Sequence, residues 1–139
     1  MNTLEFEKLV QVLNFFAVKN NGKIDRMKAV KLLFFADKYH IRKYGRPVVW
    51  SKYFAMKMGP VSSEALDISK KNTKQLSESL IEKASIFLKE EDEYSLKSIK
   101  EVDEDVFSET DIEALNFSWE CFKDFLTSDL VNIPHAYPE

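Results

Sequence analysis

The architecture of this chain is built around residues 26–44, RMKAVKLLFFADKYHIRKY. Its apolar side chains recur at helical spacing but cover far more than one stripe, which is typical of a central helix packed by neighbours on several sides. Asp25 precedes the stretch as a good N-cap, and Gly45 follows it where a left-handed residue often ends a helix. The sequence therefore predicts one long central helix over residues 26–44.

Two further amphipathic helices are expected, one before and one after this stretch. Residues 4–18 repeat apolar side chains at helical spacing, and NNG at 20–22 then supplies a stop. Ser108 is a good cap for a later helix that runs to about Leu130, with Asp111 as an acid in its first turn. Each of these helices has to bury a wide apolar face, so we expect them to pack together with the central helix.

The segment after the central helix predicts a β-strand. Residues 53–58, YFAMKM, alternate large apolar residues with alanine and lysine, which favours a strand, although Ser51 is also placed to cap a short helix. Gly59-Pro60 is expected to break the strand, and Ser62 or Ser63 to cap another helix.

A hairpin is expected later in the chain. IFLK at 86–89 and YSLK at 94–97 flank the acidic residues 90–93, an arrangement typical of two strands joined by an acidic turn. The predicted elements together indicate a mainly α, α+β fold. We expect a single compact helical domain over residues 1–139 with a small antiparallel β element.

The bulk composition predicts a cytoplasmic protein without membrane association. The chain has 139 residues, of which 45% are hydrophobic, enough for a core that needs no disulfide or metal. No apolar run approaches the ~18 residues of a membrane span, and no basic segment leads into an apolar signal sequence. Cys121 is the single cysteine, which suits a reducing compartment.

The charges are distributed unevenly along the chain. Residues 1–60 hold 12 Lys and Arg against 4 Asp and Glu, whereas residues 61–139 hold 8 against 19. The basic half can attract nucleic acid or an acidic partner, and the acidic half a basic partner. Alternatively, the two halves fold against each other and neutralise part of their charge.

The residues that could carry chemistry form no catalytic, cofactor-binding or metal-binding set. His40 and His135 are far apart in the chain, and Cys121 has no partner at metal-ligand spacing. Asp37 and His40 share one side of the predicted helix and could orient a base, but a surface ion pair is favoured, as is a buried structural role for Cys121. The single glycines form no phosphate-binding loop. We therefore expect a protein that is not an enzyme.

Binding of nucleic acid is a further alternative. Basic residues gather on and around the central helix and could contact phosphates. The helix is also strongly apolar, and no helix-turn-helix pair offers an exposed recognition helix, so a solvated basic face is favoured. The basic residues are Lys23, Arg26, Lys28, Lys31, Lys38, Arg42, Lys43 and Arg46.

Two dense motifs resemble a known family. KLLFFADKYH at 31–40, followed by GRP at 45–47 and YFAMKMGPV at 53–61, is similar to the Panacea-domain antitoxins, which are SocA-like and also called phage-associated proteins. Phe34 stands where tyrosine is common in the family. The resemblance extends to YSL at 94–96, SETD at 108–111 and the residues His135, Pro138 and Glu139.

The resemblance implies an antitoxin of a bacterial or prophage toxin–antitoxin pair. Such a protein binds its cognate protein toxin, encoded by an adjacent gene, and neutralises it directly. The alternatives are an adaptor that delivers the toxin to a AAA+ protease, and a DNA-binding regulator of its own operon. We expect the interface within residues 31–61 rather than at the acidic turn. The predicted partner-binding residues are Asp37, His40, Arg46, Tyr53 and Lys57.

Overall fold

The computed structural model describes residues 1–56, 59–72 and 74–130. The elements in chain order are α1 (Thr3–Lys19), β1 (Lys23–Asp25), α2 (Arg26–Tyr44), β2 (Tyr53–Met56), β3 (Gly59–Ser62), α3 (Ser63–Lys70), α4 (Glu78–Ser85), β4 (Leu88–Glu90), β5 (Ser95–Ser98), the 3-10 helix η1 (Glu104–Val106) and α5 (Glu109–Phe122). The structure confirms the predicted mainly helical α+β fold.

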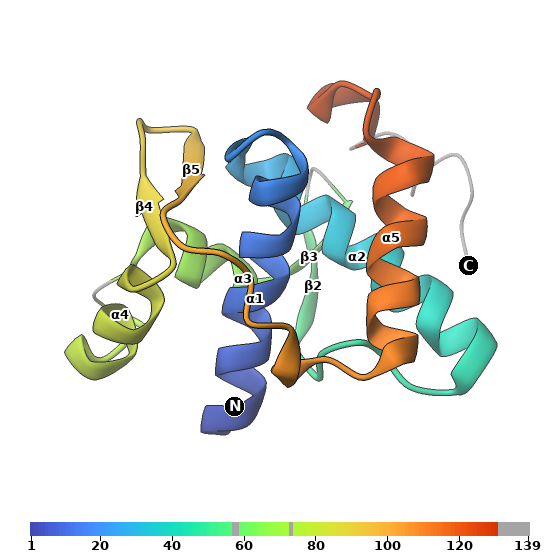
Figure 1. Cartoon of the computed structure of the whole chain (residues 1–139), viewed down its shortest axis with the longest axis horizontal. Coiled ribbons are helices and arrows are strands. Elements are labelled where there is room, and N and C mark those ends of the chain that lie inside the picture. Colours follow the sequence, from blue (N-terminus) through green and yellow to red (C-terminus); the bar gives the residue numbers. More distant parts are fainter. Residues whose placement is uncertain (57–58, 73, 131–139) are drawn as a thin grey trace.

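Helix α2 is the central element, as its sequence predicts. It packs against α1, α3 and α5 and against strand β3 (Figure 1). The Asp25 side chain caps its first turn by accepting from the Lys28 amide at 2.9 Å, and Gly45 ends it with a left-handed φ of 82°. Most of its side chains up to His40 are buried, including the charged residues Lys31 and Asp37.

Helix α5 packs along α2 but is shorter than the sequence predicts. The Ser118 hydroxyl donates to the Leu32 carbonyl at 2.7 Å, and the Phe35 and Phe122 rings stack with centroids 4.2 Å apart. Ser108 and Asp111 form the expected cap as a full capping box. The predicted end near Leu130 is wrong, because the helix breaks after Phe122 and residues 127–130 form a separate helical turn.

The strands form two small antiparallel sheets. The predicted hairpin with its acidic turn is confirmed as β4 and β5, and β1 adds a third strand that pairs with β5. Strands β2 and β3 form the second sheet, in which Ala55 lies opposite Pro60. Strand β2 ends before Gly59-Pro60 as expected, but Gly59-Pro60 also begins a second strand, because a two-stranded ribbon leaves proline an edge where no amide donor is needed. Met58 lies outside the described residues.

The oppositely charged halves of the chain face each other. Ion pairs join basic residues of the first half to acidic residues of the second: Lys8–Asp111 at 2.8 Å, Lys23–Asp92 at 3.6 Å, Arg26–Glu90 at 4.0 Å, Lys43–Glu113 at 2.7 Å and Arg46–Asp111 at 3.1 Å. These ion pairs neutralise part of the opposite charges that the two halves carry. No helix in the described part of the chain has the length and apolar character needed to cross a membrane.

Candidate functional site

Asp37 anchors the segment that connects α2 to the β2–β3 hairpin. Its side chain is only 2% exposed. One carboxyl oxygen, Oδ1, accepts from the backbone amides of Val48 at 2.8 Å and Val49 at 3.3 Å. The other oxygen, Oδ2, accepts from the Tyr53 hydroxyl at 2.6 Å. A single buried carboxyl group therefore holds both ends of residues 48–53.

Burial and hydrogen bonding act on the charge of Asp37 in opposite directions. Burial raises the pKa of Asp37 to about 7, although the bonds from Tyr53 and the two amides favour the charged form and lower it. Burial and the adjacent carboxyl raise the pKa of Tyr53 well above its ordinary value. The Tyr53 phenol is thus a neutral donor, and Asp37 changes charge near neutral pH.

Lys31 is a second buried anchor on α2. Its side chain has no exposed surface, and its Nζ donates to the Pro60 carbonyl at 2.9 Å. Burial lowers the pKa of Lys31 to about 8. Lys31 and Asp37 therefore fasten opposite ends of the following motif to the same helix.

His40 is a buried crosslink between α2, the following loop and α5. Its ring is fully buried, with Nδ1 at 2.6 Å from the Arg46 carbonyl and Nε2 at 2.8 Å from the Thr110 hydroxyl. Because a carbonyl only accepts, Nδ1 carries a proton and donates it to the Arg46 carbonyl. The expected surface ion pair of Asp37 and His40 is wrong, since both side chains are buried and bond to other groups.

Arg46 and Lys8 meet at the buried carboxylate of Asp111. Lys8 Nζ lies 2.8 Å from Oδ2 and Arg46 Nη1 lies 3.1 Å from Oδ1. Burial alone would raise the pKa of Asp111, but the bonds from Lys8 and the Ser108 amide and the two cationic charges hold it below its ordinary value. Asp111 is therefore a charged centre that joins α1, the loop and α5.

The structure brings four of the five predicted partner-binding residues together as two bonded pairs. Asp37 of α2 bonds Tyr53 of β2, and His40 of α2 bonds the Arg46 carbonyl, with both His40 and Arg46 also reaching α5. Lys57 lies outside the described residues. Asp37 and His40 are buried and act on the surface only through the backbone that they anchor. Their contribution to partner binding stays a prediction.

Two exposed aromatic residues near the Asp37 anchor were not among the predicted partner-binding residues. Trp50 is 62% exposed and Phe54 is 54% exposed, with the exposed Lys52 between them. The exposure of Phe54 follows from strand alternation, because neighbours in a strand point to opposite faces and Tyr53 points inward to Asp37. We call Trp50, Lys52 and Phe54 the 50–54 surface.

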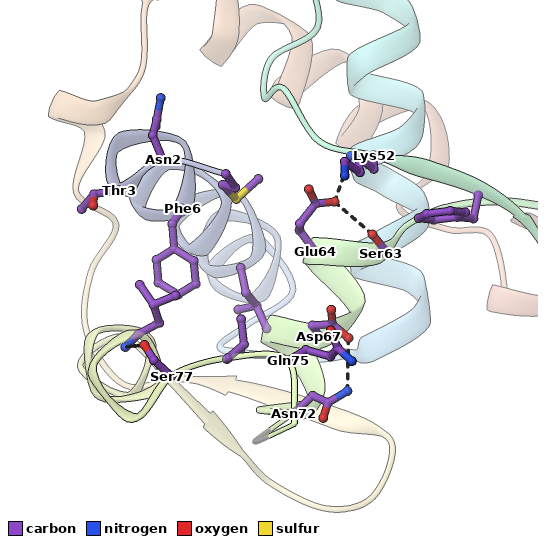
Figure 2. A pocket seen from close by; sticks show the side chains of 15 residues that line it. Asn2, Thr3, Phe6, Lys52, Ser63, Glu64, Asp67, Asn72, Gln75 and Ser77 are labelled. Atoms are coloured by element: carbon purple, nitrogen blue, oxygen red, sulfur yellow. Dashed lines mark hydrogen bonds between the residues drawn. The ribbon is translucent and has the colours of Figure 1, made fainter.

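A groove of about 890 Å³ opens beside this surface (Figure 2). Its apolar lining includes Phe6 of α1, Phe54 of β2, Ile68 of α3 and Leu80 of α4. Glu64 lies at the Lys52 side, where its Oε1 accepts from the Lys52 amide at 2.9 Å and the Ser63 hydroxyl at 3.1 Å. The groove and the 50–54 surface thus form one continuous region with apolar and polar character.

Those candidate catalytic or metal-binding groups that the structure describes do not converge. Cys121 is exposed on α5, so the expectation of a buried structural cysteine is wrong. Over residues 1–56, 59–72 and 74–130, no group of three or more His, Cys, Asp or Glu side chains is placed to hold a metal ion. His135 lies outside the described residues, as do the other two C-terminal residues of the resemblance, Pro138 and Glu139.

Comparison with known proteins identifies the family. The model of the family described as antitoxin SocA-like, Panacea domain, matches residues 30–139. The match begins within α2 and includes the anchors Lys31 and Asp37, the β2–β3 hairpin and α5. No curated protein and no solved structure gives a significant match. The chain therefore belongs to the family of SocA-like antitoxins with a Panacea domain.

Proposed function

We propose that this protein neutralises a cognate protein toxin, encoded by an adjacent gene, by binding it directly in the cytoplasm. The family supports the antitoxin role. The observation that carries the proposal is the 50–54 surface, where two large aromatic side chains are exposed on a firmly held backbone. Tryptophan in particular is enriched among the residues that dominate binding energy at protein interfaces.

Hydrogen bonds hold the backbone of this surface along its length. The Trp50 amide donates to Glu5 Oε2 at 3.2 Å, and the Lys52 amide donates to Glu64 Oε1. The Lys52 carbonyl accepts from the Ser63 amide at 3.0 Å. The Asp37 carboxyl also bonds both ends of residues 48–53. The segment is therefore ordered before a partner binds, so binding costs less conformational entropy.

The contacts of the basic residues favour a protein partner over nucleic acid. Lys31 is buried, and the Lys28 Nζ donates to the Lys123 carbonyl at 2.6 Å. Lys23, Arg26, Lys43 and Arg46 each lie within ion-pair distance of a carboxylate. Most of the basic cluster is therefore engaged within the chain, and regulation of the operon by DNA binding has less support.

Co-expression tests the proposal. The chain is expressed with the product of the adjacent gene, and growth, co-purification and affinity are measured for the wild type, Trp50→Ala and Phe54→Ala. We expect the wild type to restore growth and to co-purify with the toxin. Each variant should bind the toxin at least about tenfold more weakly, which corresponds to a loss of about 1.4 kcal/mol of binding free energy. Tyr94→Ala is the matched control, because Tyr94 is 67% exposed but lies at the acidic turn.

Two outcomes would contradict direct neutralisation at this surface. Growth rescue without any complex would remove direct binding, and rescue that disappears in cells lacking AAA+ proteases would favour the adaptor mechanism. Full binding by both aromatic variants together with loss of binding by Tyr94→Ala would place the interface at the acidic turn.

A further inference from the structure

Apolar and acidic side chains share the groove beside the 50–54 surface. Phe6 of α1 and Leu80 of α4 supply apolar surface, whereas Glu64 and Asp67 of α3 supply carboxylates. Figure 2 shows Phe6 on one side of the groove and the two residues of α3 on the other. The volume of about 890 Å³ leaves room for more than one side chain of a partner.

Neither of these carboxylates is neutralised in the described part of the chain. Glu64 Oε1 accepts from the Lys52 amide and the Ser63 hydroxyl, and Asp67 Oδ1 accepts from the Asn72 side-chain amide at 3.3 Å. All three donors are uncharged groups. No described lysine or arginine side chain lies within ion-pair distance of either carboxylate. The second oxygen of each carboxylate is therefore available to a cation from a partner.

The spacing of the two carboxylates also favours a cation between them. Glu64 and Asp67 are three residues apart on one helix, where side chains are neighbours and like charges repel. Both residues are half-buried, so water and salt screen their charges less than at an open surface. A cation that contacts both carboxylates would relieve this repulsion.

The remaining charge of the groove does not change its sign. Lys52 is the single cationic side chain among the described lining residues, against the two carboxylates of α3. It contacts Glu64 through its backbone amide, which carries no charge. The lining is therefore acidic on balance. A nucleic acid would be repelled, because its phosphates need a row of cations.

The position of the groove makes a cation necessary in any partner that covers it. Phe54 belongs both to the 50–54 surface and to the groove lining, so a partner that packs on Phe54 also reaches the groove. Covering two charged carboxylates without a cation would remove water from them and destabilise the complex. Arginine suits this position, because its planar guanidinium has several donors and can bond two carboxylates at once.

We infer that this groove binds a segment of the partner toxin that carries an arginine beside an apolar side chain. The arginine bonds the available oxygens of Glu64 and Asp67, and the apolar side chain packs against Phe6 and Leu80. The identity of the partner rests on the proposed function, whereas the chemistry of the segment rests on the groove.

Affinity measurements with the product of the adjacent gene test the charge of the groove. The double variant Glu64→Gln/Asp67→Asn removes both charges but keeps an oxygen for the hydrogen bonds within the chain. We expect it to bind at least about tenfold more weakly and to show a smaller dependence of affinity on salt concentration. Glu91→Gln/Asp92→Asn is the matched control, because it removes the same charge from the exposed acidic turn and should bind like the wild type.

A double-mutant cycle identifies the arginine of the partner. Each arginine of the toxin is changed to glutamine in turn, and its affinity is measured for the wild-type chain and for Glu64→Gln/Asp67→Asn. We expect one arginine whose loss no longer weakens binding once the two carboxylates are absent. Losses that simply add for every arginine of the toxin would overturn the inference, because no arginine would then interact with the carboxylates.

Photocrosslinking gives an independent test of what occupies the groove. Gln75 is exposed and lines the groove, so a photoreactive residue can be incorporated in its place in the full chain. We expect a crosslink to the toxin segment that contains the arginine identified by the cycle. A crosslink to a second copy of this chain, or to nucleic acid, would overturn the inference.

The two proposals fail in different ways. If the wild-type chain forms no complex with the product of the adjacent gene, the proposed function is overturned and this inference with it. If the complex forms and Trp50→Ala weakens it, but Glu64→Gln/Asp67→Asn binds as tightly as the wild type, only the groove inference is overturned.

Discussion

The Tyr53 hydroxyl donates to the buried Asp37 carboxyl over 2.6 Å, and this bond couples the first strand of the hairpin to the central helix. The same carboxyl accepts the amides of Val48 and Val49, so its loss would release residues 48–53 at both ends. The exposed aromatic residues Trp50 and Phe54 are displayed by this arrangement.

Tyr53→Phe is expected to destabilise the fold. The change removes one donor from a buried carboxyl group, which should lower the free energy of unfolding by about 1–3 kcal/mol at pH 8, where Asp37 is ionised. Urea denaturation monitored by circular dichroism measures the change. Tyr94→Phe is the control, because Tyr94 is exposed and should tolerate loss of its hydroxyl. Equal midpoints for Tyr53→Phe and wild type would show that the bond contributes nothing.

The stability of the wild type relative to Asp37→Asn should depend on pH. Burial raises the pKa of Asp37 in the folded chain to about 7, so the folded state binds a proton more tightly than the unfolded state. The stability from this group is fully present below the unfolded pKa near 4 and is lost as pH rises through 7. The wild type should therefore become less stable relative to Asp37→Asn between pH 4 and pH 8.

Asparagine is a suitable comparison because it stays neutral while still accepting the two backbone amides. Unfolding measured for both proteins across this pH range isolates the contribution of Asp37, since their other titrating groups are shared. A constant difference in unfolding free energy would contradict the raised pKa.

Lys31 should contribute a pH dependence at the alkaline end. Burial lowers its pKa to about 8, so between pH 8 and about 10.5 the unfolded state binds more protons than the folded state. Stability from this group should rise with pH across that window. Lys31→Met lacks the titrating amine, so its stability relative to wild type should fall over the same range. A parallel pH profile for the two proteins would show that the buried amine keeps its ordinary pKa.

Cys121→Ser should leave stability and growth rescue unchanged. Cys121 is exposed, and a surface substitution of this size usually changes stability by less than about 0.5 kcal/mol. The proposal that the protein is not an enzyme predicts the same neutral result for rescue. Loss of rescue by a Cys121→Ser variant that is stable and still binds toxin would instead support a catalytic thiol.

Local sequence signals predicted the helices well because their causes are local. Asp25 and Ser108 cap α2 and α5 through amides three residues ahead, and Gly45 ends α2 by adopting a left-handed conformation. The end of α5 was predicted too late, since the apolar spacing continues past the break. Leu126 continues that spacing but is 70% exposed after the helix ends.

Non-local pairing explains what was missed in the sheets. Strand β1 has only three residues, and it pairs with β5, which is separated from it by about half of the sequence. No local pattern therefore predicts this strand. Pro60 looked like a strand breaker because proline has no amide proton. Its place on a two-stranded ribbon opposite Ala55 makes that donor unnecessary.

The central helix, its caps and the two motifs that identify the family could all be predicted from the sequence, because they depend on residue type and spacing within a few turns. The sequence also placed Asp37 and His40 on one side of that helix. The burial of this side could not be predicted, since it depends on residues 46–53 and α5, which cover it and supply the hydrogen-bond partners. The same packing turns Tyr53 inward and leaves Trp50 and Phe54 exposed, because a buried carboxyl group must be satisfied by the chain that encloses it.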